Sequence, residues 1–117
     1  MNKVCISGRL VREPYVHSLQ NQLQLTTIYI ANNIYYGGNE KTGFFKVNAW
    51  GNLGKIIAEH CKTGTKLFVT GRLEQSQYQN KDGNTIYDVS INMEHFEFGE
   101  SRVSESSSSS DSEQSTT

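Results

Sequence analysis

The segment GFFKVNAW, residues 43–50, reads as a β-strand with two unlike faces. Successive side chains of a strand point to opposite sides. One side therefore carries Phe45, Val47 and Ala49, an apolar underside suited to a core. The other side carries two aromatic rings with a cation and an amide between them: Phe44, Lys46, Asn48 and Trp50. Aromatic planes interleaved with positive charge suit nucleic acid, because bases stack on rings and phosphates need cations. The strand alone leaves a second interpretation open, in which Phe44 or Trp50 packs beneath a loop.

The chain on both sides of this segment predicts four more strands. Alternation and β-branched or aromatic residues place them at residues 3–10, 23–31, 65–79 and 85–93. A helix is predicted over residues 53–61, with Asn52 as its N-cap and Gly64 as its C-terminal stop. Residues 32–42 are expected to form a loop or flexible hairpin with Gly37-Gly38 at the tip.

Irregularities along these strands predict bends. The only proline, Pro14, must bend the first strand, which is expected to resume at Tyr15-Val16-His17. Gly71 suggests a bulge in the fourth strand, and the last strand is expected to break or bulge near Glu94-His95. The sequence Lys81-Asp82-Gly83-Asn84 is a hairpin signal between them.

This order of elements predicts an all-β domain, a five-stranded Greek-key barrel of the OB type. The single short helix falls between the third and fourth strands, where that barrel needs it. A β-sandwich is the alternative, but it usually has more strands and offers no place for the helix.

The 117 residues divide into two parts of different character. Residues 1–99 carry ten Lys or Arg and eight Asp or Glu, a mildly basic balance of +2, and form the predicted OB-fold domain. Residues 100–117 carry a balance of −3, contain Ser106–Ser110 in a row and have no apolar residue after Val103. Such a Ser-rich acidic segment cannot bury enough surface to fold, so a disordered tail is expected.

Several classes of protein are disfavoured by what the sequence lacks. The two cysteines do not make a disulfide framework, and no Cys or His pair has metal-ligand spacing, so no metal or other cofactor is expected. There is no nucleophile–base arrangement, no acid pair on one element and no phosphate-binding loop, so the chain is not expected to be an enzyme. With no apolar run of membrane-spanning length and no signal-peptide pattern, we expect a cytoplasmic, nucleoid-associated protein without membrane partners.

Five segments, in order, resemble the bacterial single-stranded DNA-binding protein family over residues 1–98. They are Asn2-Lys3-Val4 with Gly8-Arg9-Leu10, Val47–Gly51, Leu53–Glu59, Lys62-Thr63-Gly64 and Val69–Leu73. The resemblance implies an OB-fold homotetramer that binds and protects single-stranded DNA without sequence preference during replication, recombination and repair. The alternative is a smaller OB-fold relative, the primosomal replication-restart protein, which would act mainly through protein partners.

The resemblance also implies roles for individual residues. Bases would stack on four aromatic side chains: Tyr36, Phe44, Trp50 and Tyr78. Phosphates would be neutralised by seven basic residues: Lys3, Arg9, Arg12, Lys46, Lys55, Lys62 and Arg72. For Lys55 and Lys62 a solvated surface charge is the competing interpretation, whereas Lys46 and Arg72 share a face with aromatic residues.

The chain departs from this family at its end. The family's tail closes on a short acidic and apolar tip that recruits replication and repair enzymes, but Glu113–Thr117 has no apolar residue. That class of partner is therefore left open, and a specialised plasmid, phage or organelle-type version is one interpretation of the departure.

Overall fold

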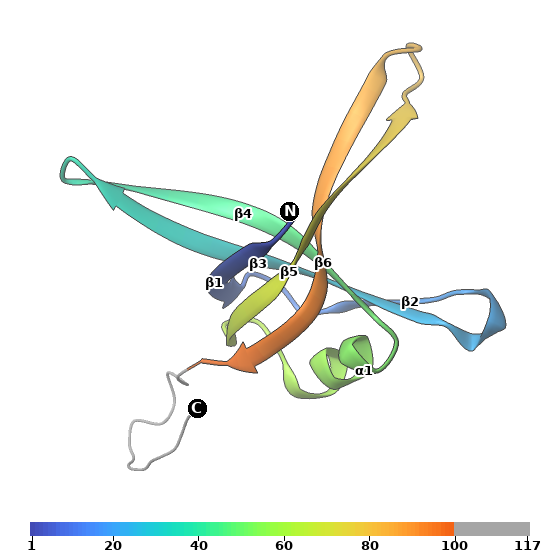
Figure 1. The fold of residues 1–117 in the computed structure, drawn as a ribbon, viewed down its shortest axis with the longest axis horizontal. Helices are drawn as coiled ribbons and strands as arrows, with labels where there is room; N and C mark the ends of the chain where they lie inside the picture. The colour runs from blue at the N-terminus through green and yellow to red at the C-terminus, as the bar shows by residue number, and fades with distance from the viewer. Residues whose placement is uncertain (100–117) are drawn as a thin grey trace.

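In the computed structural model, which describes residues 1–99, six strands and one helix follow one another along the chain (Figure 1). A single 3₁₀ turn at Gln20–Gln22 separates the second and third strands. The elements are β1 (Val4–Leu10), β2 (Tyr15–Ser18), β3 (Gln24–Tyr36), β4 (Asn39–Trp50), α1 (Gly51–His60), β5 (Lys66–Gln79) and β6 (Thr85–Phe98). The predicted tail, residues 100–117, lies outside the described residues.

Five of the strands close into a barrel in the order β1-β5-β6-β4-β3. Closure comes from β1 pairing with β3 through Arg9↔Ala31 and Leu10↔Ile30. All pairings are antiparallel except that of β4 with β6. The predicted OB barrel is confirmed, with α1 between its third and fourth strands, labelled β4 and β5 here because β2 is a separate short strand at the edge of β3.

The core consists of the inward-facing residues of the barrel strands, as the period-two pattern predicts. Most are aliphatic side chains that are fully or almost fully buried: Leu10, Ile28, Ile30, Val47, Ala49, Leu67, Val69, Ile91 and Met93. Helix α1 covers one end of the barrel and contributes Ile57 to this core. Gly54 allows the helix to approach closely, since an added Cβ would lie 2.8 Å from the Thr26 hydroxyl, which donates a hydrogen bond to the Gly54 carbonyl.

The predicted start of the helix is wrong. The helix begins at Gly51, Trp50 occupies the N-cap position, and no side-chain cap is present. Asn52 therefore lies inside the first turn instead of capping it. Packing of α1 on the barrel holds this end, because tertiary contacts supply most of the stability of a short helix.

The β3–β4 and β5–β6 hairpins project from the barrel as arms, and the β2–β3 hairpin extends in a third direction (Figure 1). Residues 32–42, expected to be a loop or a flexible hairpin, form a hairpin, because β3 and β4 remain paired out to Tyr36↔Asn39. Only Gly37 and Gly38 form the turn, both with positive φ as predicted for the tip. The β5–β6 arm turns at Asn80–Asn84, which confirms the predicted hairpin.

The irregularity predicted near Glu94-His95 is a bulge, and β6 continues past it to Phe98. Thr70 pairs with His95 while the next residue, Gly71, pairs with Met93, so Glu94 is the extra residue. Gly71 is required here, since a Cβ at this position would collide with the Asn92 carbonyl.

Both cysteines are free thiols, and the one after the helix is buried. Burial raises the pKa of Cys61 from its usual 9.0 to about 11. In a Cys5→Ser variant at pH 8, we therefore expect Cys61 to react with a thiol reagent roughly 100-fold or more slowly than an ordinary cysteine, since the thiolate is the reactive form. Reaction-rate measurement in buffer and in denaturant checks this, and equally fast labelling in both conditions would contradict the buried placement.

Candidate nucleic-acid interface

The outward side of the β3–β4 ladder carries the residues that the sequence singled out. Residues opposite each other in the ladder point to the same side, and Phe44, Lys46, Asn48 and Trp50 pair with Ala31, Tyr29, Thr27 and Leu25. Phe44 is 66% exposed and Trp50 40% exposed. Val47 and Ala49 on the underside are fully buried, whereas Phe45, on the same underside, is exposed. The predicted separation into two faces is confirmed for this strand.

The same outward side continues from β4 across β6 to β5. Asn48 pairs with Asn92 across the parallel junction, and Asn92 pairs with Arg72. Along β5, every second residue after Arg72 points to this same side, and the third of these is Tyr78, which is 58% exposed. We call this surface the aromatic face; its members used below are Tyr15, Tyr29, Tyr35, Phe44, Lys46, Trp50, Arg72 and Tyr78.

The structure brings together three of the four predicted stacking residues and separates the fourth. Tyr36 pairs with Asn39 on the opposite side of the ladder, whereas Tyr35 pairs with Glu40 on the aromatic face. The Tyr35 hydroxyl donates a hydrogen bond of 3.2 Å to the Glu40 carboxylate, which raises the pKa of that tyrosine. Tyr36 was predicted from the family resemblance, whereas extending the period-two pattern from Tyr29 along β3 selects Tyr35.

The edge strand β2 adds aromatic residues that the sequence reasoning missed. Tyr15 and His17 pair with Thr27 and Leu25, so both lie on the aromatic face. The centres of their rings lie 4.2 Å apart, with the edge of one ring facing the other. Beside them, the Arg12 guanidinium lies 4.7 Å from the ring centre of Tyr29, so this predicted phosphate contact covers an aromatic ring.

Three predicted phosphate contacts already have carboxylate partners. Lys46 Nζ lies 3.0 Å from Asp88 Oδ2, and Arg72 Nε lies 3.0 Å from Glu94 Oε2. Lys3 Nζ lies 2.8 Å from the other oxygen of Glu94. The Lys3 hydrogen bond is the main cause that lowers the pKa of Glu94, with Arg72 contributing, so this carboxylate is ionised at neutral pH.

The three remaining predicted basic residues lie in two places. Arg9 pairs with Ala31, the residue opposite Phe44, so it points to the same outward side, and it donates a hydrogen bond of 3.0 Å to the Gly64 carbonyl. Lys55 lies on α1 and Lys62 just after it, at the end of the barrel that the helix covers. These two do not belong to the aromatic face.

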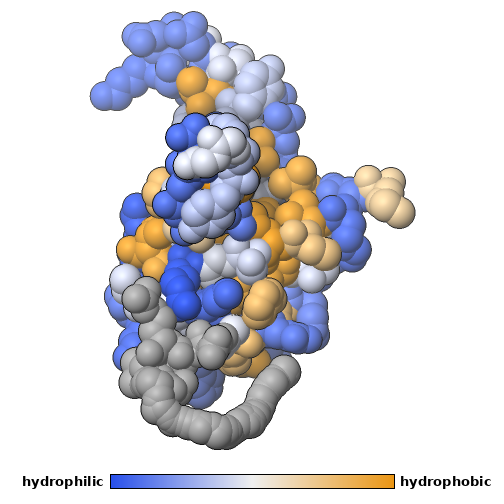
Figure 2. Space-filling view, turned by 90° about the vertical axis from the view of Figure 1, so that its left-hand side faces the viewer, coloured by the Kyte–Doolittle hydropathy of each residue, from blue (hydrophilic) through white to orange (hydrophobic). Residues whose placement is uncertain are grey.

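Hydrophobic residues are exposed in separate patches among hydrophilic ones on the side of the molecule from which the β3–β4 arm projects (Figure 2). Within residues 1–99, no group of three or more His, Cys, Asp or Glu side chains is placed to hold a metal ion. No helix in that part of the chain is long and apolar enough to cross a membrane.

Comparison with known proteins gives relatives of one kind. A single-stranded DNA-binding protein of Malacoplasma penetrans is 33% identical over 110 residues, which are 94% of this chain and 58% of that protein. The chain thus spans little more than half the length of that relative. Single-stranded DNA-binding protein 1 of Clostridium acetobutylicum is 27% identical over 106 residues, covering 87% of this chain and 96% of that protein.

A solved structure supports the fold. It is described as a Plasmodium falciparum SSB complex with ssDNA, and it superposes with a TM-score of 0.80 at 18% sequence identity over 86% of this chain and 96% of that one. The model of the single-strand binding protein family matches residues 1–99. That family is non-catalytic, so the prediction that the chain is not an enzyme is confirmed. The match covers most of the chain, and the chain therefore belongs to the single-strand binding protein family.

Proposed function

We propose that this protein binds single-stranded DNA without sequence preference and protects it during replication, recombination and repair. The observation that carries the proposal is the aromatic face, on which exposed rings from β3, β4 and β5 are interleaved with Lys46 and Arg72. Stacking on rings is sequence-tolerant, because every base presents a π-face. The names of its relatives, which are single-stranded DNA-binding proteins, and the DNA-bound structural neighbour support the same proposal.

The proposal extends to assembly and location. A homotetramer in the bacterial cytoplasm, associated with the nucleoid, is the form that the family resemblance implies. Exposed hydrophobic side chains on the opposite side of the β5–β6 ladder from Arg72 and Tyr78, among them Leu73 and Val89, give such an assembly apolar surface to bury.

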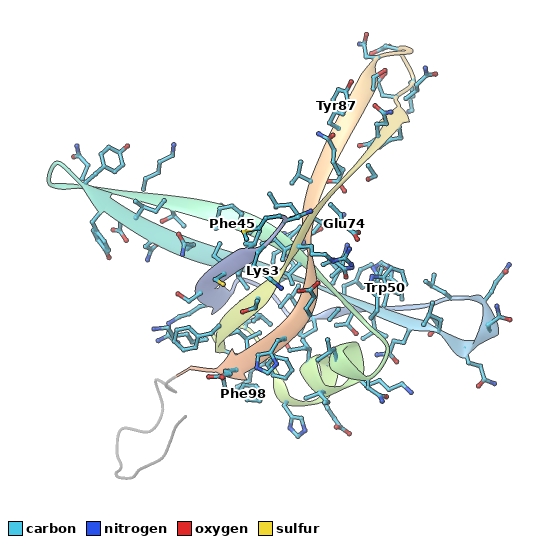
Figure 3. All side chains as sticks on the ribbon, in the orientation of Figure 1. Lys3, Phe45, Trp50, Glu74, Tyr87 and Phe98 are labelled. Carbon is cyan, nitrogen blue, oxygen red and sulfur yellow. The ribbon has the colours of Figure 1, made fainter. Side chains whose placement is uncertain are left out.

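The fluorescence of Trp50 tests the proposal directly, since it is the only tryptophan of the chain and projects from the end of β4 (Figure 3). Titration with oligo-dT is expected to quench this fluorescence, because a base stacks on the indole, whereas a duplex of equal length should not. The apparent affinity should fall as salt rises, because bound phosphates release counterions.

The opposite result is equally informative. If oligo-dT neither quenches Trp50 nor binds at low salt, the aromatic face serves a protein contact, and the replication-restart alternative takes its place. Fluorescence in the presence of duplex DNA serves as the control for non-specific electrostatic association.

A further inference from the structure

Three carboxylates form ion pairs with three cations on or beside the aromatic face. Asp88 is paired with Lys46, and Glu94 is paired with both Arg72 and Lys3. Glu74 lies 3.5 Å from the Arg72 guanidinium. These three cations and three carboxylates have a formal net charge of zero, so this cluster carries no excess of positive charge.

The strand register places these carboxylates on the aromatic face itself. Asp88 pairs with Ser76, and Glu74 pairs with Ser90, both on the outward side of the β5–β6 ladder. Glu94 is the extra residue of the β6 bulge, which brings its carboxylate between Lys3 and Arg72. Lys3 and Glu74 both lie where β5 and β6 leave the barrel (Figure 3).

Further contacts hold the acidic side chains in position. The Asn92 side chain donates a hydrogen bond of 3.1 Å to the same Glu74 oxygen that faces Arg72. The Lys3 hydrogen bond, with Arg72 contributing, lowers the pKa of Glu94, which shows that both cations favour its charged form. The carboxylates are therefore held in position where they meet the cations.

These ion pairs remain accessible to a competitor. The six side chains are between 31% and 55% exposed. Exposed pairs of this kind add little to folding stability, so folding does not oppose an exchange of partner. A DNA phosphate can take the place of a carboxylate without entering the core.

We propose that Glu74, Asp88 and Glu94 compete with DNA phosphates for Lys46, Arg72 and Lys3 and thereby lower the affinity of the protein for single-stranded DNA. This inference rests on the proposed function, because it concerns the same face. A cation that already has a carboxylate partner gains less from a phosphate than a free cation does. Binding then depends more on stacking, and its salt dependence is shallower than the number of cations suggests.

The Asp88→Asn variant is the sharpest test, since Asp88 is the only carboxylate within salt-bridge distance of Lys46 in residues 1–99. Its affinity for labelled oligo-dT, measured by fluorescence anisotropy, is expected to rise about fivefold at low salt, the factor that one exposed charge pair is worth in water. The slope of log K against log salt should steepen by up to about 0.7, the contribution of one neutralised phosphate on a single strand. A gain in affinity cannot result from misfolding.

Two controls separate competition for a cation from a general change of charge. Glu40→Gln removes one negative charge from the same face, but Glu40 makes no ion pair with any residue in 1–99. Its effect is expected to be the smaller one. In a Lys46→Met background, Asp88→Asn should add no more than Glu40→Gln does, because the cation for which Asp88 competes is gone.

Each pattern of results decides the inference. Equal gains for Asp88→Asn and Glu40→Gln, or an undiminished gain without Lys46, would overturn it in favour of a general field effect. If the wild-type chain binds oligo-dT and Asp88→Asn binds no better, this inference fails while the proposed function stands. If only Asp88→Asn binds, competition is supported in its strongest form; if neither binds, both proposals fail.

Discussion

Replacing both Phe44 and Trp50 with alanine is expected to lower the affinity for oligo-dT by between about 30-fold and 10⁴-fold. A base stacked on an aromatic side chain contributes about 1–3 kcal/mol, so two rings contribute about 2–6 kcal/mol. Both rings lie on the same outward side of β4 and are exposed, 66% and 40% respectively. Anisotropy of a labelled oligo-dT measures the loss, since the variant has no tryptophan.

The matched control is Tyr87→Ala, which removes an equally exposed ring from the other side of an arm. Tyr87 is 60% exposed and lies on the β5–β6 arm (Figure 3), where it pairs with Gln77 and not with a residue of the aromatic face. The affinity of this variant for oligo-dT should stay within about twofold of wild type, because it loses no ring on which a base would stack. Comparable losses in both variants would mean that DNA does not distinguish the two sides of the strands.

Replacement of Phe44 and Trp50 by alanine is not expected to disturb the fold. Phe44 and Trp50 are not among the buried residues of the core, and the β3–β4 ladder is held by backbone hydrogen bonds that alanine retains. Unchanged circular dichroism and thermal melting would confirm that the affinity loss comes from the rings themselves. A double variant that binds within threefold of wild type would remove the aromatic face as the basis of the proposed function.

The parts of the fold that could be predicted from sequence are those with one buried side. Val47 and Ala49 alternate with exposed residues, and Leu67 and Val69 do the same on β5. Because only one face of such a strand is buried, hydrophobic residues recur at every second position, and this alternation can be recognised in the sequence. The bulge was visible for a related reason, because Phe96 falls out of phase with Met93 unless one residue is extra.

The parts that could not be predicted lack a buried side or depend on distant residues. Residues 32–42 are mostly polar strand in an arm outside the barrel, so no alternation of hydrophobic residues marks them. Tyr36 was therefore chosen from the family resemblance alone, and only the register shows that Tyr35 and not Tyr36 lies on the aromatic face. The pairing of Lys46 with Asp88 joins residues 42 positions apart, and that of Lys3 with Glu94 joins residues 91 apart. The basic residues could be chosen from the sequence, but their carboxylate partners are known only once the pairing of the strands is known.

Substitution of Ile57 by alanine is expected to lower the free energy of unfolding by about 2–5 kcal/mol. Ile57 is fully buried where α1 covers the end of the barrel, and truncation of such a side chain leaves a cavity that the surrounding strands fill only in part. This is a large share of the 5–15 kcal/mol that stabilises an ordinary domain. Thermal melting should show a decrease of at least about 8 °C.

The neighbouring residue provides the control, because Ile56→Ala is the same chemical change on the same helix. Ile56 is 40% exposed, so its truncation leaves no closed cavity and should cost less than about 1 kcal/mol. Below its melting temperature, Ile57→Ala should still bind oligo-dT with nearly wild-type affinity, since the strand ladders and not the helix position the aromatic face. Affinity lost without any loss of stability would instead mean that α1, which begins directly after Trp50, positions that ring for DNA.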